Sequence, residues 1–341
     1  MTAATPADFD AFLLLSARIG SNRLLTQGAG GNTSIKSDGF TWIKASGTWL
    51  AEALERSIMV PVRTSPLLQA LRTDPRSIEN PTVYVDQDAN PAGLRPSIET
   101  AFHCLLPQRV VAHFHGIDAL AHLVCADRHA TLSAAMAGLP GLRWQLFDYF
   151  RPGAPLAAEI DAHLRPGTEV LFLANHGVII AGASVDAVGQ ILDQLSDVLI
   201  RPARAVPPAA PDRLAAIAVQ TGYVLSDDPL HNSLGTDAIS SALARIGVLM
   251  PDQAIFLGNG FCFDPEQISQ QPAVLIVEGA GVLLRADLSK GAVEMVGCVA
   301  ELLRRLPGNA PLVPLRAGDV DQLLNWEAEI YRQSLDRKSS T

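Results

Sequence analysis

Few cysteines and an excess of acidic over basic residues are the first features of this sequence. Its 341 residues include four cysteines, which are far apart and form no CxxC pair. This scatter argues against a disulfide framework and against a cysteine-ligated zinc motif. We expect four buried, reduced thiols in a cytoplasmic protein, at Cys104, Cys125, Cys262 and Cys298.

Positive charge is also in deficit. Lys and Arg number 26 against 35 Asp and Glu, which gives a formal net charge of −9. Nucleic acids and anionic membrane surfaces attract basic proteins, so neither is expected as a partner. No apolar run approaches the roughly 18–20 residues that a membrane span needs. Residues 1–20 lack a basic leader, and an amphipathic helix is predicted over residues 6–20 in place of a signal peptide.

The chain nevertheless has the composition of a well-packed globular protein. Hydrophobic residues make up 48% and charged residues 18%. This balance excludes a disordered chain, and the length fits one large core or two modest ones.

Two histidines at the end of a predicted buried strand are the centre of the functional argument. The strand is expected over residues 110–116, with the sequence VVAHFHG. Because successive side chains of a strand point to opposite faces, His113 and His115 project from the same face, roughly 7 Å apart along the strand. Two imidazoles at that spacing can bind one metal ion, although many strand ends carry a histidine that only packs.

A third histidine strengthens this hypothesis. His176 follows another apolar strand, expected over Glu169–Ala174, and precedes Gly177. A strand break beside a glycine lets a side chain face a cavity. Three neutral imidazoles suit Zn²⁺ or another divalent first-row metal, at about 2.0–2.1 Å and with positions left open.

A carboxylate is predicted close to these histidines. Glu99 lies near the start of a helix expected over residues 95–106, where the backbone amides stabilise negative charge. Beside a metal, this carboxylate would transfer protons at a carbon next to a carbonyl group. The alternative is a glutamate that only faces solvent or the helix dipole. His103, four residues later, orients Glu99 or simply packs.

A glycine-rich turn is the second candidate binding element. The sequence QGAGGNTS begins at Gln27 and precedes a hairpin expected over residues 34–44. No Lys-Ser or Lys-Thr pair follows the glycines and no helix follows the turn, which excludes a Walker motif and argues against a dinucleotide fingerprint. With Ser46-Gly47 and Ser97, the turn predicts an anion pocket made of backbone N–H groups and small polar side chains. A plain glycine loop is the alternative.

The second half of the chain contains a candidate internal repeat. It follows a Pro- and Ala-rich linker predicted at residues 204–213. Residues 170–178 align with 274–282, and residues 106–116 align with 250–260. The second copy has Leu257, Asn259 and Ala280 where the first has its three histidines. We therefore expect residues 214–341 to keep the strand scaffold without the metal, unless the two sets of apolar strands are merely alike.

Five motifs together resemble the class II aldolase/adducin family. They are GAGGNTS (28–34), IKASG (43–47), PSIETAFH (96–103), VVAHFHG (110–116) and LANHGVIIAG (173–182), in family order over about residues 8–200. Rhamnulose- and fuculose-phosphate aldolases belong to this family. The second half is similar to the aldolase portion of proteins in which that portion is fused to a short-chain dehydrogenase, but no dehydrogenase-like sequence follows here.

The resemblance implies an α/β fold with a central, mainly antiparallel sheet flanked by helices over residues 1–203, and a homo-oligomer, with a tetramer favoured. It implies a zinc site at His113, His115 and His176 and an acid–base role for Glu99. It implies a small-molecule sugar or sugar phosphate as substrate. The phosphate would bind at Gly30, Gly31, Asn32, Ser46, Gly47 and Ser97.

Two departures from the family pattern affect these expectations. The phosphate loop of the family often has two serines before the glutamate, and the second is Ile98 here. Fuculose-phosphate aldolases use a tyrosine of a neighbouring subunit as proton donor. The matching position here is Trp144, whose indole is a poor acid, so Tyr149 is the expected donor.

The sequence thus predicts a lyase of carbohydrate metabolism that cleaves a ketose 1-phosphate or related hydroxy-keto sugar through a metal-stabilised enediolate. A sugar-acid phosphate decarboxylase, an epimerase or a dehydratase would use the same residues. A non-catalytic, adducin-like scaffold is the third reading, and retention of all three histidines and Glu99 argues against it.

Overall fold

The computed structural model describes residues 2–326. Contacts divide the chain into two units. The first comprises residues up to Gly116 together with Leu132–Leu199, and the second comprises Ile117–Thr131 together with the described residues from Ile200 onward. The predicted division into residues 1–203, a linker at 204–213 and residues 214–341 stays a prediction.

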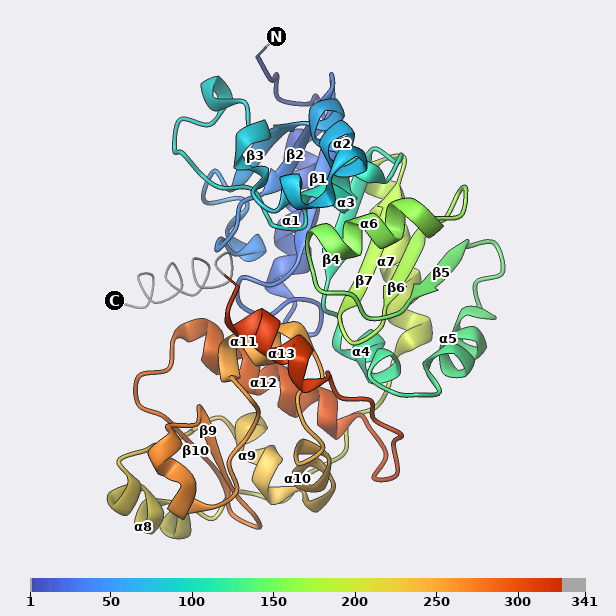
Figure 1. Ribbon diagram of the computed structural model, residues 1–341. Coiled ribbons are helices and arrows are strands. Elements are labelled where there is room, and N and C mark those ends of the chain that lie inside the picture. The colour runs from blue at the N-terminus through green and yellow to red at the C-terminus, as the bar shows by residue number, and fades with distance from the viewer. Residues whose placement is uncertain (1, 327–341) are drawn as a thin grey trace. The chain divides into compact units, whose positions relative to one another are not determined.

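A seven-stranded sheet forms the centre of the first unit (Figure 1). Its strand order is β3-β2-β1-β4-β7-β6-β5, and every neighbouring pair is antiparallel except β5 and β6. The predicted mainly antiparallel sheet is therefore confirmed. Its strands are β1 (Asn32–Ser37), β2 (Phe40–Lys44), β3 (Met59–Arg63), β4 (Val110–Phe114), β5 (Trp144–Phe147), β6 (Val170–Leu173) and β7 (Gly177–Gly182).

The predicted hairpin is formed by β1 and β2. Asp38 and Gly39 connect the two strands and have φ angles of 49° and 82°. Positive φ at both central residues matches the right-handed twist of a two-residue hairpin, and Asp-Gly is a favoured pair for this turn. The turn fixes the register in which Ser34 lies opposite Ile43.

Helices cover both faces of this sheet. The helices α1 (Phe9–Ser21) and α7 (Val185–Leu199) pack on one face, where the Ser16 hydroxyl lies 2.7 Å from that of Thr33. On the other face Ser34 contacts α3 (Thr100–Leu105), because adjacent residues of a strand point in opposite directions. The helices α2 (Thr64–Thr73) and α6 (Ala154–His163) pack beside α3.

The apolar core between the sheet and α2, α3 and α6 follows this alternation. Every second residue of the central strands contributes to it, including Ile43, Val111, Leu171 and Ile179. The side chain of His113 lies on the same face as that of Val111, two residues earlier. The sheet therefore directs this imidazole toward the layer that contains α3.

Two helical segments have bounds that are set by contacts outside the helix, and one of them differs from the prediction. The segment after β4 forms two helices, α4 (Ile117–Leu123) and α5 (Arg128–Met136). The chain between them leaves the helical conformation because it pairs with another segment of the second unit, where Ala126 N donates to Pro311 O at 2.8 Å. The helix expected from residue 95 begins only at Thr100. The preceding residues form a turn in which Ser97 O accepts from Thr100 N at 3.1 Å.

The second unit is built around a three-stranded sheet with the order β8-β10-β9. Its strands are β8 (Val224–Leu225), β9 (Val274–Val277) and β10 (Gly281–Leu284). Besides α4, its helices are α8 (Pro211–Thr221), α9 (Pro229–Thr236), α10 (Ala238–Ala244), α11 (Pro251–Leu257), α12 (Lys290–Arg304) and α13 (Ala317–Leu324).

One stretch of the proposed repeat has the same secondary structure in both copies and the other does not, and the repeat itself stays a prediction. The hairpin β9–β10 followed by α12 matches β6–β7 followed by α7, and both helices have 15 residues. The other aligned stretch, residues 250–260, contains the helix α11 where the first unit has the strand β4. Pro251 stands at the first helical position of α11, where its fixed φ and missing N–H favour a helix start.

Two smaller expectations concern the thiols and the membrane. All four cysteines are free and buried, as predicted. Within residues 2–326, no helix combines the length and the apolar character that crossing a lipid bilayer would require.

Candidate metal centre and acid–base site

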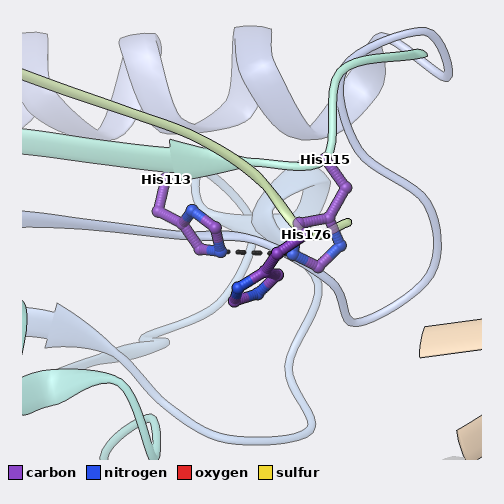
Figure 2. Close-up of side chains that lie close together, drawn as sticks. All are labelled: His113, His115 and His176. Carbon is purple, nitrogen blue, oxygen red and sulfur yellow. Dashed lines mark hydrogen bonds between the residues drawn. The ribbon is translucent and has the colours of Figure 1, made fainter. Parts of the chain in front are cut away.

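The first unit brings the three predicted histidines together. His113 lies near the end of β4, His115 follows two residues later, and His176 lies in the turn between β6 and β7. Their rings converge in Figure 2, with centroids 4.9–5.2 Å apart. One ring nitrogen from each lies within 4.8 Å of the others, and all three residues are buried.

The turn that presents His176 has a left-handed residue. Asn175 has a φ of 56°, and His176 N donates to Leu173 O at 3.1 Å. Asparagine tolerates this conformation better than most residues. The tight turn carries the chain directly from β6 into β7, which places His176 at the edge of the sheet where β4 ends.

Gly177 lets the two histidine-bearing segments approach each other. A Cβ at this position would lie 2.6 Å from Phe114 O and 3.0 Å from Cδ2 of His115. A side chain therefore cannot be accommodated without moving the main chain of β4. The sequence motif of histidine followed by glycine thus has a steric cause.

The geometry of the three rings fits one divalent cation. His113 Nδ1 donates to Val178 O at 3.0 Å, which leaves its Nε2 as a lone-pair nitrogen. That Nε2 lies 3.2 Å from Nε2 of His115, the dashed line in Figure 2. Two nitrogens bound at about 2.05 Å to one tetrahedral zinc ion would lie about 3.3 Å apart. The three imidazoles could therefore hold such an ion.

The carboxylate of Glu99 faces the same space. Its Oε2 lies 3.4 Å from Nε2 of His113, and its Oε1 lies 3.4 Å from Nε2 of His176. Glu99 is the N-cap of α3 and is buried, not solvent-facing. Burial alone would raise the pKa of Glu99, but His113, His176 and a hydrogen bond from Asn32 outweigh it and lower the pKa. The hydrogen bond that Asn32 donates favours the ionised carboxylate of Glu99.

Asn32 lies at the junction of the predicted anion pocket and this carboxylate. It is directly opposite His113 in the β1–β4 register. Its Nδ2 donates to Glu99 Oε2 at 2.8 Å and to Ser97 Oγ at 3.2 Å. The Ser97 hydroxyl also accepts from Glu99 N at 3.2 Å. Ser97 thus supports Asn32 and Glu99 as well as being a candidate substrate ligand.

The remaining residues of the predicted anion pocket lie in adjoining loops. Ser46 and Gly47 follow β2 and are partly exposed, and Ser46 N donates to Arg95 O at 2.8 Å. Gly30 and Gly31 are buried. A Cβ at Gly31 would lie 2.8 Å from His113 O, and its φ is +63°, so glycine is required there by packing against β4.

Lys44 is a buried residue beside the candidate site that sequence reasoning missed. It is 2% exposed, and its Nζ donates to Ala29 O at 2.8 Å and to Thr48 O at 2.6 Å. The ammonium group therefore joins the glycine-rich turn to the loop after β2. A lysine that ends an apolar strand between two small-residue turns was the available signal.

Tyr149, the predicted proton donor, follows β5. Because β5 and β6 are parallel, their carboxyl ends lie at one edge of the sheet, and Phe147 O accepts from Ala174 N at 2.9 Å. The segments that continue to Tyr149 and to His176 thus leave the sheet at the same edge. The phenol oxygen is buried, and its role as donor stays a prediction.

Comparison with known proteins agrees with the motifs. Residues 13–198 match the family described as Class II Aldolase and Adducin N-terminal domain, and the chain belongs to this family. The uncharacterized oxidoreductase YuxG of Bacillus subtilis (strain 168) is 27% identical over 195 residues, or 53% of this chain. The chain spans only 27% of the length of that relative.

Solved structures that align with part of this chain include a class II aldolase domain and an L-fuculose-1-phosphate aldolase. The N-terminal class II aldolase domain of a conserved Thermoplasma acidophilum protein is 24% identical, covers 58% of this chain and 95% of its own, and has a TM-score of 0.45. The L-fuculose-1-phosphate aldolase of Thermus thermophilus is 16% identical, covers 62% and 96%, and has a TM-score of 0.37.

Proposed function

We propose that this chain is a metal-dependent lyase, a class II aldolase that cleaves a ketose 1-phosphate or a related hydroxy-keto sugar. The observation that carries the proposal is the position of Glu99, whose two carboxylate oxygens each lie 3.4 Å from a ring nitrogen of the histidine cluster. Membership of the class II aldolase family supports the same reaction class.

The histidines would hold Zn²⁺ or another first-row divalent cation, which when bound polarises a substrate carbonyl and stabilises negative charge on its oxygen. Glu99 would move a proton at the carbon next to that carbonyl, since its carboxylate is buried and held by Asn32. Tyr149 would exchange a proton with the oxygen of the aldehyde fragment.

The phosphate or another polar end of the substrate would bind at the adjoining loops. Backbone N–H groups and hydroxyls there suit an anion. The candidate ligands are Gly30, Gly31, Asn32, Ser46, Gly47 and Ser97. The buried ammonium of Lys44 beneath both loops adds positive charge to this end of the site.

A product-resolved assay tests this proposal. The zinc-loaded protein is incubated with a panel of ketose 1-phosphates and unphosphorylated ketoses, and products are identified by mass and by NMR. We expect dihydroxyacetone phosphate, or dihydroxyacetone, together with an aldehyde. Glu99→Gln should retain the metal and lose about 10²–10⁴-fold in turnover; an undiminished rate would refute the role of Glu99.

The same assay distinguishes the neighbouring reactions. Loss of carbon dioxide, an isomer of unchanged mass or loss of water would identify a decarboxylase, an epimerase or a dehydratase in place of the aldolase. No turnover together with no uptake of divalent metal would favour a scaffold.

We further propose that the protein is a cytoplasmic homo-oligomer, with a tetramer favoured. Sedimentation of the full chain would test the oligomeric state.

A further inference from the structure

A continuous line of four buried polar side chains runs beside β1 and ends at Glu99. Ser34 Oγ lies 2.8 Å from His103 Nδ1, His103 Nε2 contacts Asn32 Oδ1, and Asn32 Nδ2 lies 2.8 Å from Glu99 Oε2. The exposed fractions of these four residues are between 0% and 6%. Water therefore does not compete for these hydrogen bonds.

The direction of each hydrogen bond follows from the chemistry of its end group. A carboxylate only accepts, so the amide nitrogen of Asn32 must face Glu99. The amide oxygen of Asn32 then faces His103 and requires a donor. His103 must therefore carry a proton on Nε2, and in the neutral ring its Nδ1 accepts from the Ser34 hydroxyl.

The surroundings favour that neutral ring. Burial lowers the pKa of His103 well below its ordinary value, and the nearby His113 and Lys36 lower it further. His103 also stacks on Phe102, with ring centroids 4.7 Å apart. Stacking alone would explain a ring at this position, but it would not explain why both ring nitrogens meet polar partners.

We propose that His103 is a positioning residue: by donating from Nε2 it fixes the amide orientation of Asn32, which in turn holds the Glu99 carboxylate between His113 and His176. This inference rests on the proposed acid–base function of Glu99. Without the His103 donor, the buried amide oxygen of Asn32 lacks a hydrogen-bond partner, so the Asn32 side chain is no longer held in the orientation that lets its nitrogen donate to Glu99. When that hydrogen bond weakens, Glu99 loses its defined position.

Two amide substitutions separate positioning from packing. In His103→Gln the amide nitrogen can occupy the place of Nε2 and still donate to Asn32. In His103→Asn the side chain is one methylene shorter and reaches only the place of Nδ1. We expect His103→Gln to stay within about threefold of the wild-type kcat. His103→Asn should lose at least about thirtyfold in kcat, with KM and zinc content nearly unchanged.

A measurement without turnover keeps this inference separate from the proposed reaction. ¹⁵N NMR of the ring nitrogens of the full chain should show His103 protonated at Nε2 and unprotonated at Nδ1. Crystal structures should show Glu99 displaced in His103→Asn and retained in His103→Gln. The opposite tautomer, or an unmoved Glu99 in His103→Asn, would overturn the inference whether or not the protein proves to be an aldolase. Equal kcat in the two variants of an active enzyme would overturn it as well.

Discussion

Gly177 and Phe114 are so close that a Cβ on the glycine would lie 2.6 Å from the carbonyl oxygen of Phe114. Phe114 separates His113 from His115, so a main-chain shift there moves both rings. We expect Gly177→Ala to fold and to bind zinc at least about tenfold more weakly than wild type, measured by calorimetric titration. Gly141→Ala, where no atom lies within 4 Å of the added Cβ, is the matched control. Unchanged zinc affinity in Gly177→Ala would contradict this steric account.

Metal removal should lower thermal stability. A ligand that binds only the folded state adds about 2.7 kcal/mol at one hundred times its Kd. We expect chelation to lower the unfolding midpoint of the wild type and added zinc to restore it. His176→Ala should show no zinc response, whereas His163→Ala, with a side chain that is 62% exposed, should respond as the wild type does. A zinc response retained by His176→Ala would remove this histidine from the site.

The left-handed residue in the turn between β6 and β7 should tolerate glycine but not a β-branched residue. Asn175 and Gly279 occupy equivalent positions and have φ angles of 56° and 72°. A β-branched residue in this conformation costs roughly 1–2 kcal/mol or more. We expect Asn175→Val to be destabilised by that amount in urea unfolding, and Asn175→Gly to unfold within about 0.5 kcal/mol of wild type. If both variants are destabilised equally, the loss of stability comes from the missing contacts of the asparagine side chain and not from the backbone conformation.

Lys36 should make stability depend on pH. Burial lowers its pKa from 10.5 to about 8, and its Nζ donates to Gln108 O at 2.7 Å. The unfolded chain therefore binds more protons between pH 8 and 10.5, so this group makes stability rise with pH through that window. Across the whole window, this shift in pKa corresponds to a gain of about 3 kcal/mol in the free energy of unfolding.

Lys36→Met tests this linkage. Burial raises the pKa of the Cys104 thiol to about 11, so such thiols make stability fall with pH over part of the same range. The effect of Lys36 is therefore measured as the difference in stability between the wild type and Lys36→Met at each pH. The stability of wild type minus that of Lys36→Met should increase from pH 8 to 10.5 in urea titrations. A constant difference over that range would show that Lys36 is not shifted.

Local sequence patterns predicted the elements that carry the site. The period of two in VVAHFHG placed both histidines on one face, and the Asp38-Gly39 pair identified the hairpin. Residues 250–260 were assigned wrongly because a short apolar run has the same pattern in a strand and in a buried helix. Pro251 before that run was the signal that would have separated the two.

Tertiary contacts account for what the sequence did not reveal. The two ring nitrogens of His103 find partners only because α3 lies over β1, and no local pattern contains that information. Lys44 likewise joins two loops that are separated in the chain by a hairpin. The helix break near Cys125 depends on pairing with residues almost two hundred positions later.

The assignment of α4 to the second unit limits how this protein can be cut or recombined. The helix begins immediately after Gly116, and Ile117, Leu120 and Leu123 are fully buried, with α4 packed against α12. A fragment that stopped at residue 203 would keep all three histidines but would lack α12, so the apolar residues of α4 would be exposed to water. We therefore expect such an N-terminal fragment to aggregate and to express poorly unless the apolar face of α4 is redesigned with polar residues.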